Sequence, residues 1–364
     1  MAAYAAAAAA PPAAPPAAPA AAAAPDFNDG FDVCGPPVLH GLRLAGRARF
    51  SILSHLRAAH SSGGGLFGFM TMRESNKLRV QCAEARAEVA AFEWADACWA
   101  RQDDADDDSR VTGSVAAWRR AFPAARAVNV SGRADLRDAD FAHVRGGPRA
   151  RLHTVRMREC RGVTDAAFAH LRGVRALDMS FCDQEAVTDA AFAHLAGIHA
   201  LNMSGCSQIT VTDAAVAHLR GVHALDVTDC RISDAAFAHL AGIHTLSVGG
   251  FWSALITDAA FAHLRGVHTL DIGGCRRVTD AAFAHLRGVH SLDMSWCDQP
   301  AITDAAFAHL RGIDTLNMSH CSQATLAGAG FEHLRGVRDL RTHGCSAAVI
   351  AAAAAIFARG ASEF

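Results

Sequence analysis

The chain has 364 residues, with 34 Lys and Arg against 36 Asp and Glu, and a formal net charge of −2. This balance, without a basic cluster, argues against nucleic-acid binding. The alanine-rich stretches are too weakly apolar to span a membrane, and the N-terminus lacks the charged and leucine-rich regions of a signal peptide.

Residues 1–25 consist almost entirely of alanine and proline. Such a segment cannot bury enough side-chain surface to become ordered, so we expect a disordered leader. The arginine and serine typical of a transit peptide are missing from it.

Residues 26–120 are irregular and predict a separate helical module. Apolar residues recur at helical spacing over 39–60, and 61–65 form a Ser/Gly-rich break. The stretch 66–82 reads Leu-Phe-Gly-Phe-Met-Thr-Met-Arg-Glu-Ser-Asn-Lys-Leu-Arg-Val-Gln-Cys. It resembles the middle of an F-box, the helical module that docks on the Skp-type adaptor of a cullin–RING ubiquitin ligase. This resemblance implies that the adaptor-binding residues are Phe67, Met70, Leu78, Val80 and Cys82.

Two features depart from the F-box pattern. The Leu-Pro that opens the motif is missing, and Ala85 stands where the family usually has Trp. The module is therefore either an F-box or a generic helical cap on the domain that follows. The acidic run at 103–108 predicts a solvated loop rather than a cation site, and 114–123 predicts a short helix.

Residues 121–345 repeat one unit, which is cleanest at 278–294. A Thr or Ser recurs at 164, 188, 212, 233, 257, 279 and 303, in steps of 21 to 24 residues. Thr-Asp predicts a helix start, and Gly permits a left-handed exit after about two turns. The segment Val-x-x-Leu-x-Met/Val/Ile-x-x-Cys then alternates as a strand with one buried face.

This pattern resembles the cysteine-containing leucine-rich repeats best known from F-box/leucine-rich-repeat proteins. The resemblance implies an α/β solenoid, with parallel strands on the concave face and short helices on the convex face. Residues 346–364 predict a capping helix and tail. The expected strand centres give ten turns: Val128, Val155, Leu177, Leu201, Leu225, Leu246, Leu270, Leu292, Leu316 and Leu340.

Eight of the 11 cysteines occupy one repeat position. A thiol there packs as a small apolar group in a ladder, which predicts a reducing compartment and a cytoplasmic or nuclear location. The eight are Cys160, Cys182, Cys206, Cys230, Cys275, Cys297, Cys321 and Cys345.

The strand position between the two buried residues predicts a polar column on the concave face. The column either grips a basic or hydrogen-bonding partner or keeps the sheet soluble. Trp252 and Trp296 lie on turns two repeats apart. They either form a binding hot spot, or each folds over a longer loop and covers core. Phe251 is expected to fill a position of the cysteine ladder. The candidate partner-binding residues are Asp178, Asn202, Asp226, Asp271, Asp293, Asn317, Trp252 and Trp296.

Histidine forms two columns, one in the helices and one just before the strands. A metal site needs three or four converging ligands, whereas a ladder offers parallel rings, so we expect no metal and no cofactor. No Ser/His/Asp set, phosphate loop or carboxylate pair stands apart from the repeat. We therefore expect no catalytic residues and no enzymatic activity.

These features favour a monomeric substrate receptor of an SCF-type cullin–RING ubiquitin ligase. The N-terminal module would hold the Skp-type adaptor, and the concave face would hold a protein substrate, without nucleic acid or membrane as a partner. The alternative is a non-ligase scaffold whose N-terminal helices only cap the array.

Overall fold

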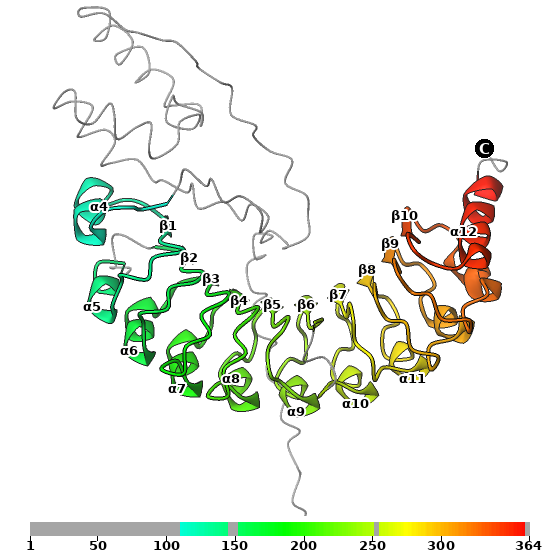
Figure 1. The fold of residues 1–364 in the computed structure, drawn as a ribbon, viewed down its shortest axis with the longest axis horizontal. Coiled ribbons are helices and arrows are strands. Elements are labelled where there is room, and N and C mark those ends of the chain that lie inside the picture. Colours follow the sequence, from blue (N-terminus) through cyan, green and yellow to red (C-terminus); the bar gives the residue numbers. More distant parts are fainter. Residues whose placement is uncertain (1–109, 145–151, 251–254, 361–364) are drawn as a thin grey trace, which may run out of the picture.

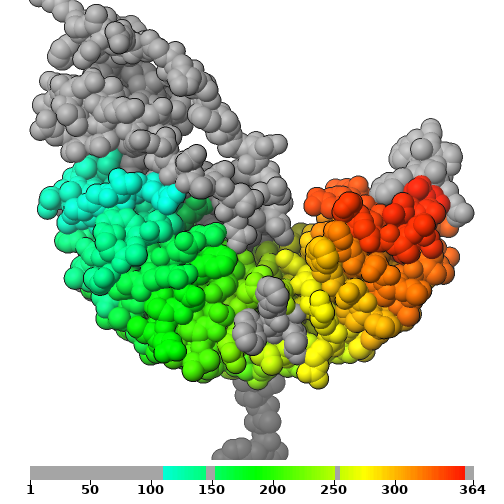
Figure 2. All heavy atoms as spheres, in the orientation of Figure 1, coloured from blue at the N-terminus to red at the C-terminus, as the bar shows by residue number. Residues whose placement is uncertain are grey.

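The computed structural model describes residues 110–144, 152–250 and 255–360. These residues form a curved solenoid with strands along its inner side and short helices along its outer side (Figure 1). In the space-filling view the described residues form one continuous arc (Figure 2). Among them, no helix has the length and apolar character needed to cross a membrane.

Ten strands form one parallel sheet in sequence order, each paired with its neighbours in the chain. Every predicted strand centre is the middle residue of a three-residue strand, so the predicted ten turns are confirmed. The strands are β1 (Ala127–Asn129), β2 (Thr154–Arg156), β3 (Ala176–Asp178), β4 (Ala200–Asn202), β5 (Ala224–Asp226), β6 (Thr245–Ser247), β7 (Thr269–Asp271), β8 (Ser291–Asp293), β9 (Thr315–Asn317) and β10 (Asp339–Arg341).

The outer helices are short: each repeat forms only about one helical turn before a glycine ends it. Gly288, for example, has a φ of 86°, a left-handed conformation that glycine adopts without strain. The helices, with η marking 3-10 geometry, are α4 (Val115–Ala121), α5 (Asp138–Phe141), α6 (Asp165–Phe168), η3 (Ala169–Leu171), α7 (Asp189–Phe192), η4 (Ala193–Leu195), α8 (Asp213–Ala217), α9 (Asp234–Phe237), α10 (Asp258–Phe261), α11 (Asp280–Phe283), η6 (Asp304–His309), η7 (Ala329–Leu334) and α12 (Ala347–Gly360).

The predicted Thr-Asp helix start is confirmed, and each Asp also joins neighbouring repeats. The hydroxyl oxygen of Thr279 accepts a hydrogen bond from the backbone N–H of Ala281, which caps α11. The backbone N–H and hydroxyl of Thr279 both donate to the Asp258 carboxylate, at 2.8 and 2.6 Å. We call each such pair a Thr–Asp staple: Asp138–Thr164, Asp165–Thr188, Asp189–Thr212, Asp213–Ser233, Asp234–Thr257, Asp258–Thr279 and Asp280–Thr303.

The hydrophobic core runs the length of the arc between sheet and helices. Each regular repeat contributes a helix Phe and a strand Leu; Phe283 and Leu292 are typical and fully buried. One repeat alone would leave both of its flanks in water, so stacking supplies most of the burial. These units, with their parallel strands and 21- to 24-residue period, form a leucine-rich repeat solenoid.

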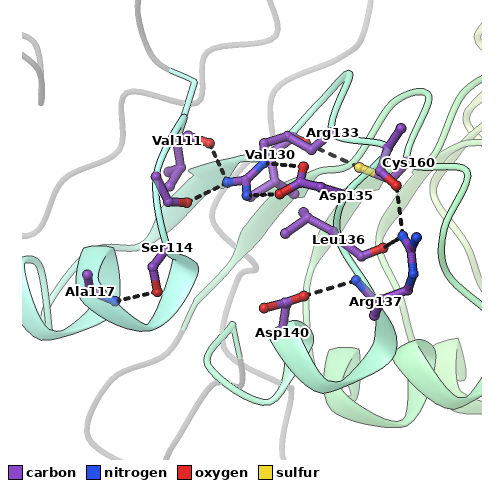
Figure 3. A network of polar contacts seen from close by, with 12 residues as sticks. Val111, Ser114, Ala117, Val130, Arg133, Asp135, Leu136, Arg137, Asp140 and Cys160 are labelled. Carbon is purple, nitrogen blue, oxygen red and sulfur yellow. Dashed lines mark hydrogen bonds and ion pairs between the residues drawn. The ribbon is translucent and has the colours of Figure 1, made fainter.

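Both described ends of the core are covered by helices. At the N-terminal end, Arg133 stands at the repeat position that elsewhere holds cysteine, and its guanidinium donates to the carbonyls of Val111 and Gly113 and to the Asp135 carboxylate (Figure 3). These bonds hold the segment leading into α4. At the C-terminal end, α12 buries Val349 against the last repeat.

The predicted cysteine ladder is confirmed, and seven of its eight members are buried. Its thiols are not purely apolar contacts, because most donate to the carbonyl of the residue that follows the strand of the preceding repeat. Cys206 Sγ lies 3.3 Å from the carbonyl oxygen of Met179, and Cys230 Sγ lies 3.0 Å from that of Met203. Burial raises the pKa of the Cys160 thiol to about 11, and burial also raises the pKa of Cys206 and of Cys230.

These thiols are expected to resist alkylation in the native protein. At pH 7.5 Cys206 and Cys230 should react roughly a hundredfold or more slowly than an exposed thiol, because burial suppresses the thiolate and blocks the reagent. Cys345 is only half-buried and should react first within the ladder. Native labelling followed by site-resolved mass spectrometry measures each rate, and rapid modification of Cys206 would contradict the packed ladder. Cys34, Cys82 and Cys98 lie outside the described residues.

Candidate functional site

The concave face carries a column of polar side chains, one from the outward position of each strand. We call it the outward column: Asn129, Arg156, Asp178, Asn202, Asp226, Ser247, Asp271, Asp293, Asn317 and Arg341. The six Asp and Asn residues predicted to bind a partner are half-buried in this column, on β3, β4, β5, β7, β8 and β9. The structure thus brings these six side chains onto one face. Neighbouring members lie on adjacent strands, except for the two that β6 separates.

Each Asp and Asn of the predicted set also closes the turn after its own strand. The side-chain Oδ1 accepts the backbone N–H two residues later, at 3.0 Å from Asp178 to Ser180 and 2.8 Å from Asp293 to Ser295. The same bond forms at Asn202, Asp226, Asp271 and Asn317. Because short Asx side chains favour such local bonds, the column has a structural role that the strand pattern alone did not reveal.

Carboxylates crowd one another near β7 and β8. Burial, and then the neighbouring carboxylate of Asp293, raise the pKa of Asp271 to about 6. Burial likewise raises the pKa of Asp226. Asn317 relieves one side of this cluster, since its Nδ2 donates to Asp293 Oδ2 at 2.7 Å. The centre of the face is therefore acidic, and the basic members of the column lie outside this centre, Arg156 on β2 and Arg341 on β10.

Replacing Asp271 by Asn is expected to stabilise the protein above pH 6. The folded-state pKa of about 6 lies above the ordinary value of 3.8, so the ionised carboxylate disfavours folding at high pH. The amide keeps the bond from the Gly273 N–H, and the gain should be on the order of 1 kcal/mol at pH 8, since the site is half-exposed and screened. Urea unfolding at pH 8 and pH 4 measures this, and the gain should vanish at pH 4. Asp298→Asn, at an exposed position, is the control; a loss of stability at pH 8 would contradict the prediction.

The edge of the concave face carries an exposed aromatic residue. Trp296 follows β8 in a left-handed conformation with φ of 60°, where several other repeats have glycine. Its ring stacks on His320 with centroids 3.9 Å apart and planes 12° apart, and 60% of its side chain is exposed. Trp296 is therefore not itself a core residue, and its role as a binding hot spot stays a prediction. Trp252 and Phe251 lie outside the described residues.

The histidines before the strands stack along the solenoid as a ladder: His199, His223, His244, His268 and His290. Neighbouring ring centroids lie 4.1 to 4.6 Å apart. Arg175 and Asp314 hold the same position at the two ends of this ladder, just before β3 and β9. The rings follow one another along the solenoid, the last four nearly parallel and His199 tilted by 41° from His223. Within the described residues no group of three His, Cys, Asp or Glu could hold a metal ion.

The other candidate residues cannot be placed in this way. Phe67, Met70, Leu78, Val80 and Cys82, the F-box-like set, lie outside the described residues. On the convex side, three helix histidines pair with an arginine of the preceding repeat: His194, His239 and His333. Arg172 lies 2.9 Å from His194 Nδ1, and Arg311 lies 3.0 Å from His333 Nδ1. Sequence spacing predicted the column but not these pairs, because their geometry depends on the offset between helices.

Comparison with known proteins gives only distant structural likeness. No family model matches the chain, and no curated protein matches its sequence. A TLR13–ssRNA13 complex is similar over 62% of this chain, with a TM-score of 0.48 and 15% identity. Two structures of the Toll–Spatzle complex from Drosophila are similar over 65% and 62%, with TM-scores of 0.46 and 0.43 and identities of 14% and 12%.

The chain spans about a third of the length of these solved structures, 33% of the first and 37% of each of the other two. At such identities and scores the likeness carries no conclusion about what this chain binds. Its fold follows instead from its own strand register and repeat period.

Proposed function

We propose that the solenoid is a protein-interaction module that holds a protein partner on its concave face. One observation carries this proposal: the outward column is fixed in place before any partner arrives. Its Asp and Asn side chains are each tied to the next turn through Oδ1. Side chains that are already ordered lose less conformational entropy on binding, so a preformed polar face favours recognition.

The dimensions of the face also suit a protein. Parallel strands lie about 4.8 Å apart, so ten of them extend over roughly 45 Å. The described part of the sheet is unbroken from β1 to β10, and it curves so that its strands face inward (Figure 1). An extended concave surface of this kind is what solenoid proteins use to bind macromolecules.

Site-specific photo-crosslinking tests the proposal. A photo-reactive residue is placed at Ser247, in the middle of the outward column, and in a second protein at exposed Ala262 on the convex side. In cells of the source, the Ser247 position should yield a discrete protein adduct that the Ala262 position does not. Identical adducts from both positions, or none from Ser247, would overturn the concave-face function.

The finer proposal is that the partner is a substrate of an SCF-type ubiquitin ligase. Support comes from the F-box-like residues Leu78, Val80 and Cys82, which precede the array as in F-box/leucine-rich-repeat proteins. The protein would act without chemistry of its own, in the cytoplasm or nucleus, where the ladder thiols stay reduced.

Binding of the full chain to a purified Skp-type adaptor tests the ligase role. The double change Leu78→Ala with Val80→Ala should abolish binding, while Ile209→Ala, at an exposed position of the solenoid, should not. If the wild-type chain does not bind the adaptor but Ser247 crosslinking succeeds, the protein is a non-ligase scaffold. Crosslinking therefore separates the two proposals.

A further inference from the structure

One face of the Trp296 indole ring is exposed to solvent beside the concave sheet. The other face rests on His320, whose ring in turn meets His343 edge-on with centroids 5.1 Å apart. This backing fixes the indole ring, although 60% of the Trp296 side chain remains exposed. A rigid exposed indole ring on a sheet edge is a strong candidate for an interface anchor, because Trp is enriched among the residues that dominate binding energy.

The charge next to this ring is negative. Asp293 Oδ1 accepts the backbone N–H of Ser295, so its carboxylate lies on the same turn that carries Trp296. Asp271 is paired with Asp293 across β7 and β8. From Asp178 to Asn317 the outward column contains Asp, Asn and Ser and no basic residue. Because the register places these two half-buried carboxylates side by side, like charges meet there, and burial and then Asp293 raise the pKa of Asp271. A cation bound beside the pair would offset both effects.

We propose that Trp296, with the Asp271–Asp293 pair, binds an arginine side chain from a basic segment of the protein partner. This inference rests on the proposed concave-face function and names the partner's chemistry. A guanidinium is planar, so it stacks on the indole face, and its N–H groups donate to carboxylates in a fork geometry. Lysine would satisfy the carboxylates but would lose the stacking contact.

The same ring could in principle stack on a nucleobase. The carboxylates argue against that occupant, because a phosphate backbone crossing β7 and β8 would meet Asp271 and Asp293. Nucleic-acid binding also needs basic groups along its path, and the column carries its basic residues, Arg156 and Arg341, only on β2 and β10.

The test uses the full chain and three fluorescent probes: an Arg-Gly-Ser repeat peptide, its Glu-Gly-Ser counterpart and a single-stranded oligouridine. Trp296→Gly removes the aromatic face and installs the residue found at this position in neighbouring repeats, Gly274 and Gly250. Glycine relaxes the left-handed backbone, so the variant should stay folded. Trp296→Phe keeps an aromatic ring, and exposed Ile209→Ala is the matched control.

The arginine peptide should bind the wild type and the Ile209→Ala control equally, as measured by anisotropy. Affinity should fall about tenfold or more in Trp296→Gly and be largely restored in Trp296→Phe. Asp293→Asn should also weaken binding, and the glutamate peptide should not bind. Equal affinity of wild type and Trp296→Gly would overturn the proposal, as would tighter binding of oligouridine than of the arginine peptide.

Crosslinking at Ser247 distinguishes this failure from failure of the concave-face function. If the Ser247 adduct persists while the arginine peptide shows no dependence on Trp296, the face binds a protein by other contacts. If the adduct is lost in Trp296→Gly together with peptide affinity, both proposals are supported. Circular dichroism melting confirms that each variant is folded before either result is compared.

Discussion

Replacing Asp258 by Ala is expected to lower the free energy of unfolding by about 2 to 3 kcal/mol. The carboxylate accepts two hydrogen bonds from the next repeat, at 2.8 Å from the Thr279 N–H and 2.6 Å from its hydroxyl. Alanine leaves both half-buried donors without this acceptor. Because neighbouring repeats share their burial, the loss should appear as one cooperative transition at lower urea concentration.

A double-mutant cycle isolates the staple from the helix cap. Thr279→Val removes the hydroxyl, which both donates to Asp258 and caps α11 by accepting from Ala281. If the staple is real, Asp258→Ala and Thr279→Val together should cost less than the sum of the two single changes. Asp298→Ala, at an exposed position outside every staple, should change stability by less than about 0.5 kcal/mol. Additive single effects would contradict the staple.

Acid is expected to destabilise the solenoid through the histidine ladder. The pKa of His199 is lowered by burial and then by the charges of His223 and Arg175. The unfolded chain, with an ordinary value near 6.5, then binds more protons, so stability falls as pH drops below about 6.5. Two charges about 4 Å apart repel by roughly 1 kcal/mol in water. Between pH 7.5 and 5 we expect a loss of about 1 to 3 kcal/mol, which lowers Tm by about 3 to 10 °C.

Two carboxylates have the opposite effect on stability: their protonation favours the folded state as pH falls. The raised pKa values of Asp226 and Asp271 mean that protonation of these carboxylates stabilises the folded state as pH falls, for Asp271 through about 6. Changing His199 and its stacked neighbour His223 to Asn should therefore flatten or reverse the acid loss. Melting curves at pH 7.5, 6 and 5 for both proteins measure the difference. An identical pH dependence in the double variant would remove the ladder as the cause.

Much of the fold could be predicted from the sequence because every repeat contains the same local sequence signals. Thr-Asp marks the start of each helix, and Gly marks its end. The alternation of apolar and polar residues, for example around Leu246 or Leu292, marks each strand. All of these are short-range signals, repeated often enough to set the register. The ten strand centres and the buried cysteines followed from them.

The contacts between repeats could not be predicted so readily. The second bond of each staple, between Asp258 and Thr279 for example, depends on how far one helix is offset from the next. The backing of Trp296 by His320 likewise joins residues 24 positions apart, through turns that both adopt left-handed backbone. Spacing along one strand identified Asp271 and Asp293 as outward-facing, yet their bonds to the following turn required the three-dimensional path of that turn.

The staples also make each junction interchangeable with the next. From 164 to 303, each unit offers the N–H and hydroxyl of a Thr, or of Ser233, to the unit before it. Each also offers a carboxylate to the unit after it, and Asp304 accepts instead from the backbone of Ala327, Gly328 and Ala329. A recombination event that deletes or duplicates one whole unit would therefore join compatible surfaces. Such an event would change the span of the inner face by one strand spacing, about 4.8 Å. The length of the concave face could therefore evolve in steps of one repeat, without any change to the residues that join neighbouring repeats.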